Sequence, residues 1–110
     1  MNLFFWKKNR IIDDFAIKLA NELYSAITPD QVALYFANSE NKKQNEKIQK
    51  KLDNQIKLYV VSIKQFKIKH SIGIYGKARL HLKFMERLKE LGYNQDISKR
   101  INELLLISTP

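Results

Sequence analysis

Residues 48–66 read IQKKLDNQIKLYVVSIKQF, and their apolar side chains recur at the spacing of one face of a helix. Successive members lie 4, 4, 3, 4 and 3 residues apart, which is the a/d pattern of a helix packed lengthwise against its neighbours. The members of this seam are Ile48, Leu52, Ile56, Tyr59, Ile63 and Phe66. The repeat is short for a coiled coil, so it predicts one long helix of a bundle.

A strand interpretation competes with the helix at the end of this segment. Leu58–Val61 is rich in β-branched and aromatic residues, and apolar residues alternate between Phe66 and Ile74. We therefore expect a helix through about residue 66 and leave open a short strand or extended segment at 67–74.

Upstream, the segment 12–27 carries apolar residues at a spacing of three and four, which predicts an amphipathic helix. Thr28-Pro29-Asp30-Gln31 follows, with Thr28 suited to cap a new helix, Pro29 to its first position and Gln31 to a capping box. A short helix should therefore begin at residue 29.

Downstream, a helix is expected from about Lys77 to Leu91, with Gly92 as its C-terminal stop. Asn94 or Asp96 should cap a last helix. With only three glycines and two prolines, the sequence predicts a mostly α fold: a small single-domain bundle of four to five helices over residues 1–110. Residues 1–10 are expected to form an aromatic and basic N-terminal arm.

The charge is concentrated in one half of the chain. Residues 42–91 contain fourteen Lys/Arg and four Asp/Glu, whereas the formal net charge of the whole chain is +9. On helices, the basic residues of this half form two stripes, one with a period of seven and the other with a period of four. The expected contacts to an acidic protein or to nucleic-acid phosphates are Lys43, Lys50, Lys57, Lys64, Lys77, Arg79, Lys83 and Arg87. A solvated helix face is the alternative interpretation of the same lysines.

The turn Gly73-Ile74-Tyr75-Gly76 offers a weaker phosphate signal. A GXXG turn clamps backbone nucleotides in KH domains, and a helix that opens with Lys77 could attract an anion. The inner residues Ile74 and Tyr75 are not basic, so a plain interhelical turn is the favoured interpretation.

No motif predicts catalysis, a metal or a cofactor. The chain has no cysteine, and His70 and His81 lack the i, i+4 spacing of a zinc-protease helix. Neither a nucleophile elbow nor a phosphate-binding glycine loop is present. We expect a non-enzymatic protein that uses no cofactor.

Both ends of the chain are apolar. Phe4, Phe5 and Trp6 precede a basic cluster, and a leucine-rich run extends from Leu104 to Ile107. The aromatic residues are expected to pack onto the bundle as a lid. If exposed, they would form, with the C-terminal run, a hydrophobic interface for a homodimer or another protein.

Neither a signal peptide nor a membrane span is predicted, because the N-terminal apolar run is short and its charges follow it. We expect a soluble, cytoplasmic protein without peripheral membrane contact. The function expected from sequence is a helical module that docks an acidic macromolecule through residues 42–91. The alternative is a structural or adaptor protein that acts through a hydrophobic interface.

Overall fold

A computed structural model of the chain describes residues 3–36 and 42–109, and these residues form five helices and no strand. The helices are α1 (Leu3–Ala26), α2 (Pro29–Phe36), α3 (Lys42–His70), α4 (Ile74–Glu90) and α5 (Gln95–Ser108). The expected small all-α bundle is confirmed. The molecule is elongated, with principal extents of 54 × 24 × 20 Å.

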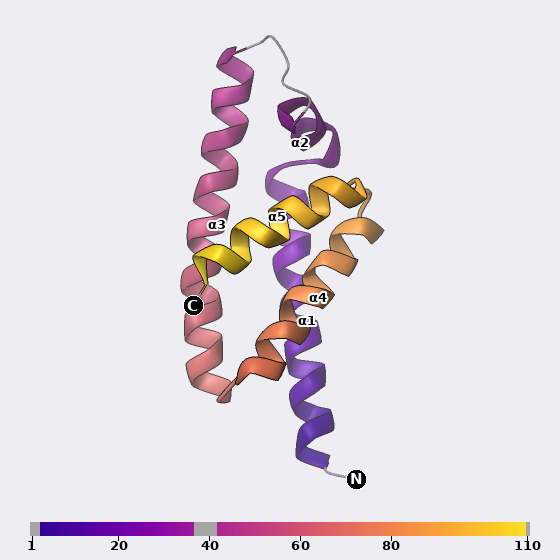
Figure 1. Cartoon of the computed structure of the whole chain (residues 1–110), viewed down its shortest axis with the longest axis vertical. Helices are drawn as coiled ribbons and strands as arrows, with labels where there is room; N and C mark the ends of the chain where they lie inside the picture. The colour runs from indigo at the N-terminus through magenta and orange to yellow at the C-terminus, as the bar shows by residue number, and fades with distance from the viewer. Residues whose placement is uncertain (1–2, 37–41, 110) are drawn as a thin grey trace.

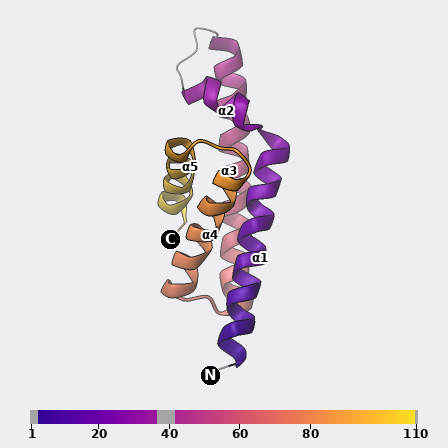
Figure 2. The same ribbon diagram turned by 90° about the vertical axis from the view of Figure 1, so that its right-hand side faces the viewer.

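The long axis is set by α1 and α3, which run in opposite directions (Figure 1). Helix α4 runs parallel to α1 and makes the most extensive interhelical contact of the molecule with it. Helix α5 packs on α3 and α4, and α2 covers the end of the molecule opposite the N-terminus (Figure 2). One hydrophobic core draws residues from all five helices.

The long seam of α3 is the centre of that core. All six seam residues are buried, and Tyr59 contacts Phe84 of α4 edge-to-face while Phe66 stacks on Phe15 of α1. The lengthwise packing predicted from the 3–4 spacing is thus confirmed.

The extended segment left open at 67–74 is not present. Lys67 to His70 continue α3, and α4 begins at Ile74 after a three-residue turn. The apparent period-2 alternation misleads because Ile68 and Ile74 are exposed, whereas Phe66 and Ile72 are buried. The burial therefore follows the helix and the turn, not a strand face.

Several helix ends match their sequence signals. The Thr28 N–H donates to Gln31 Oε1 (3.1 Å) and the Gln31 N–H to Thr28 Oγ1 (3.4 Å), which is the predicted capping box. Asn94 Oδ1 accepts from the Asp96 N–H at 2.7 Å and so caps α5. Gly92 follows the end of α4 with a φ of +104°, and this positive φ favours glycine.

Candidate docking surface

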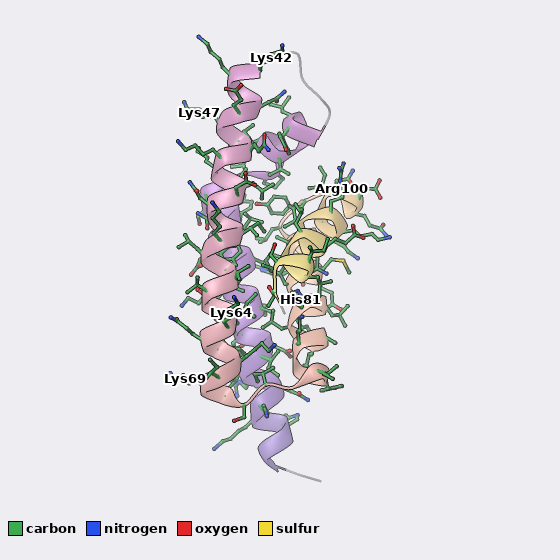
Figure 3. All side chains as sticks on the ribbon, turned by 60° about the vertical axis from the view of Figure 1, so that its left-hand side comes forward. Lys42, Lys47, Lys64, Lys69, His81 and Arg100 are labelled. Carbon is green, nitrogen blue, oxygen red and sulfur yellow. The ribbon has the colours of Figure 1, made fainter. Side chains whose placement is uncertain are left out.

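The lysines with a period of seven lie on the outer side of α3. The seam faces the core, and residues seven apart share one helix position, which for these lysines lies about 130° around the helix from the middle of the seam. Lys43, Lys50, Lys57 and Lys64 are all exposed, and we call them the lysine row. Successive members are about 10.5 Å apart along the helix, so the row is about 30 Å long. Figure 3 shows Lys47 and Lys69 on the same helix, on the side away from α5.

The lysine row has no ion-pair partner among the residues that the structure describes. Helix α3 contains nine lysines against Glu46 and Asp53, and no acidic residue occurs between residues 54 and 85. The charge of the row is therefore not neutralised within the described part of the molecule.

An exposed apolar strip runs beside the lysine row. Leu58, Val61 and Ile68 are 59%, 54% and 82% exposed. Together with Gln65 they have a spacing of 3, 4 and 3 residues, which is a second a/d seam on the outer side of α3. If Leu58 is placed at position a of a heptad, the lysine row occupies position g throughout. We call the lysine row and this strip together the α3 outer face.

The basic stripe on α4, which consists of Arg79, Lys83 and Arg87, makes contacts within the molecule instead. Arg79 makes a bidentate ion pair with Asp13 of α1, with Nε–Oδ1 and Nη2–Oδ2 distances of 2.7 and 2.8 Å. The hydrogen bonds to Asp13 raise the pKa of Arg79 above its ordinary value. Arg87 Nε donates to Asn21 Oδ1 of α1 at 3.0 Å.

The remaining expected contacts on α4 are also partnered. Lys83 pairs with Glu86 at 3.3 Å, and Lys77 Nζ donates to the Thr109 carbonyl at the end of α5 at 2.6 Å. The eight residues predicted from sequence are thus divided: the four on α3 are exposed, whereas the four on α4 hold helices together or pair within α4. Of the two stripes, only the lysine row is unpartnered within residues 3–36 and 42–109.

The N-terminal aromatic cluster does not pack as expected at its one described side chain. Trp6 is 65% exposed in the second turn of α1, so it does not act as a lid over the core. The side chains of Phe4 and Phe5 lie outside what the structure describes. Residues 3–10, expected as an arm, continue α1.

The helix period places one residue of the C-terminal run, Leu104–Ile107, in the core and the others on the surface. Leu105 is buried, whereas Leu104, Leu106 and Ile107 are 44%, 39% and 83% exposed. These three residues lie on the surface of α5, and part of the run borders a pocket of about 390 Å³ between α2, α3 and α5.

The two histidines occupy different environments. His81 is buried between α4 and α5, where Nδ1 lies 3.3 Å from Asn102 Oδ1, and burial lowers the pKa of the ring. His70 ends α3, half-buried beside Phe66. No group of three or more potential metal ligands occurs within residues 3–36 and 42–109.

The GXXG turn is part of a packed helix start. Gly73 is the N-cap residue of α4, and Gly76 is buried between Ile72 and Ile12 of α1. Because Gly76 serves the contact between α1 and α4, the interhelical interpretation of this turn fits the structure better than a nucleotide clamp.

No protein-family model matches the chain, and comparison with curated proteins and with solved structures gave no significant match. None of the helices described is both long enough and apolar enough to cross a lipid bilayer. The surface chemistry of α3 is therefore the basis for assigning a function.

Proposed function

We propose that the protein is a non-enzymatic binding module whose α3 outer face docks an acidic, amphipathic helix of another protein. The observation that carries this proposal is the exposed apolar strip at a/d spacing, bordered by lysines at position g that have no ion-pair partner among the described residues. In helix pairs, apolar a/d residues supply the contact and charges at e and g select the partner.

The spacing of the lysine row favours a helical partner. Carboxylates repeated every seven residues on a second helix would also be about 10.5 Å apart, so they could meet the row along its length. Half-exposed Leu58 and Val61 would lose their remaining contact with water in such a complex. Nucleic acid would use the lysines but would leave this apolar strip without a partner.

A second copy of the same face fits poorly. In an antiparallel pair the g positions face each other, which would place lysine opposite lysine. In a parallel pair Lys64 would face Lys69 of the partner helix, and no carboxylate would oppose the row. The charge pattern therefore favours a different, acidic chain as the partner. The absence of cysteine also suits a reducing compartment such as the cytoplasm.

A designed peptide tests the proposal. The probe is a fluorescent helix of about four heptads, with leucine at a and d and glutamate at e and g. Its binding to the full chain is measured by anisotropy at about 50 and 200 mM salt, beside labelled DNA and RNA duplexes. We expect the peptide to bind more tightly than either duplex at both salt concentrations.

Matched variants locate the site. Lys57→Gln/Lys64→Gln should weaken peptide binding about tenfold or more, because two cations beside the strip are lost. Lys83→Gln/Lys89→Gln removes the same charge from α4 and should change binding little. Equal losses in the two variants, or tighter binding of a duplex than of the peptide, would overturn the proposal.

A further inference from the structure

A second apolar and basic surface lies at the end of the molecule where α1 and α4 begin and α3 ends (Figures 1 and 2). These segments are in contact there, since Lys8 Nζ of α1 donates to the Ser71 carbonyl at 2.6 Å. Ile74 and Tyr75, the first two residues of α4, are 93% and 58% exposed, and Trp6 is 65% exposed. Three large apolar side chains from two helices therefore face solvent at one end.

The charge around these side chains is predominantly basic. Lys7, Arg10 and Lys69 are exposed at this end. No Asp or Glu occurs within residues 1–12; Asp13 is paired with Arg79, and the exposed Asp14 lies one helical turn beyond Arg10, away from the tip. We call Trp6, Ile74 and Tyr75, with Lys7, Arg10 and Lys69, the basic tip.

The form of the basic tip suits a soft planar surface better than a protein groove. Ile74 is almost fully exposed at the start of a helix, so it projects from the molecule into solvent. Tryptophan and tyrosine favour the headgroup region of a bilayer, where the ring is buried and its polar atom remains hydrated. Lysine and arginine beside them are attracted to anionic lipid.

From this chemistry we infer that the basic tip contacts an anionic lipid bilayer and holds the protein at a membrane surface. This inference reverses the expectation from sequence, in which Trp6 packed on the core. It does not depend on the proposed function, because Trp6, Ile74 and Tyr75 belong to α1 and α4, whereas the α3 outer face belongs to α3 and reaches the basic tip only at its last residue, Ile68.

Trp6 allows a direct test, since it is the only tryptophan of the chain. The full chain is mixed with vesicles of neutral phosphatidylcholine, or of phosphatidylcholine containing about one-third phosphatidylserine. We expect the Trp6 emission to shift to shorter wavelength and the protein to co-sediment with the anionic vesicles only. Co-sedimentation should weaken as salt is raised.

Variants at the two ends of the molecule provide the controls. Ile74→Ser should weaken vesicle binding about tenfold. Leu34→Ser, which removes a 47% exposed leucine from α2 at the opposite end, should leave it unchanged. Lys7→Gln/Lys69→Gln should also weaken binding, by about fivefold for each charge removed.

Two results would overturn the inference. One is the absence of binding to anionic vesicles at about 50 mM salt. The other is vesicle binding that leaves the Trp6 emission and the Ile74→Ser variant unaffected, because the lysines of α3 would then be responsible. Lys43→Gln/Lys50→Gln distinguishes the two surfaces: it should spare vesicle binding and weaken binding of the acidic peptide.

Discussion

Gly76 lies in the first turn of α4, where a Cβ atom would come within 2.6 Å of Ile72 Cγ2 and 3.2 Å of Ile12 Cδ1. Neither methyl group can move far, because both belong to buried side chains. Gly76→Ser should therefore lower the free energy of unfolding by about 1–3 kcal/mol through overpacking. Chemical denaturation measures the change.

Gly73 provides the matched control. A Cβ atom there would meet nothing within 4 Å, and the residue is the N-cap of α4 without a side-chain cap. Gly73→Ser should leave stability unchanged or raise it by up to about 1 kcal/mol. A stable Gly76→Ser protein would contradict the close approach of α4 to α1.

His81 should make stability depend on pH. Because burial lowers its pKa below the ordinary value of 6.5, the folded protein keeps the ring neutral while the unfolded chain binds a proton. The contribution of His81 to the free energy of unfolding is therefore complete above about pH 6.5. It decreases as the pH falls below this value, by up to about 1.4 kcal/mol per pH unit.

Thermal unfolding at several pH values between about 7.5 and 5 checks this prediction. In His81→Gln the amide can still donate to Asn102, and the loss of stability on acidification should be smaller. His70→Gln is the control, because that ring lies at the end of α3 and outside the contact between α4 and α5. An unchanged pH profile in His81→Gln would contradict the prediction.

At the scale of helices, the end of α3 is unusual because Ser71 takes the position that glycine favours. Its φ is +53°, and the Ile72 N–H reaches back to the Lys67 carbonyl at 2.9 Å, as in a Schellman motif. A left-handed conformation is strained for serine. Ser71→Gly should therefore raise the free energy of unfolding by about 1 kcal/mol.

A serine-to-glycine substitution inside α3 should change stability in the opposite direction. Ser62→Gly places glycine in a helix interior and should destabilise the protein by about 0.5 kcal/mol. The denaturant midpoints of the two variants, compared with that of the unsubstituted chain, measure both changes. If both variants were destabilised alike, the conformation of Ser71 would not be the cause of strain.

Helix ends with a local signal could be predicted from sequence, whereas the end of α3 could not. The capping box at Thr28 and the stop at Gly92 each depend on residues within one or two turns. The turn after His70 has no glycine at its left-handed position, so the sequence pattern there remained compatible with an extended segment.

The seven-residue spacing predicts the lysine row from sequence, but it does not predict the apolar strip beside it. The buried seam is the longer of the two apolar patterns of α3, so it defines the apolar face that the sequence predicts. The signal of the outer strip was present in the spacing of Leu58, Val61 and Ile68 around Gln65. A second a/d pattern on the opposite side of the helix is the pattern that the proposed docking on that side requires.

The two basic stripes have different environments because of how the helices are arranged in the whole molecule. Asp13–Arg79 and Asn21–Arg87 join residues of α1 and α4 that are 66 apart, so one register aligns these parallel helices. Ile27–Tyr93, just beyond the two helices, has the same separation. Spacing within α4 reveals its stripe but not its partners on α1. The spacing therefore predicts Arg79 and Arg87 as contacts to an acidic partner, whereas in the structure both side chains bond to α1.

At this scale the proposal also predicts the oligomeric state. Because no carboxylate opposes the lysine row in a self-paired complex, the chain should be a monomer of 13.0 kDa by light scattering. The mass should not change between about 50 and 200 mM salt. A stable dimer at both salt concentrations would favour the adaptor alternative, in which apolar surfaces pair two copies.

The most direct test of the central claim, that the α3 outer face is the docking surface, is a residue-resolved NMR titration. The acidic peptide is added to ¹⁵N-labelled protein and the amide shifts are followed. The largest changes should occur at Lys57, Leu58, Val61 and Lys64, with the amides around Arg79 and Arg87 unaffected. Changes centred on α4 and α1 instead would contradict the claim.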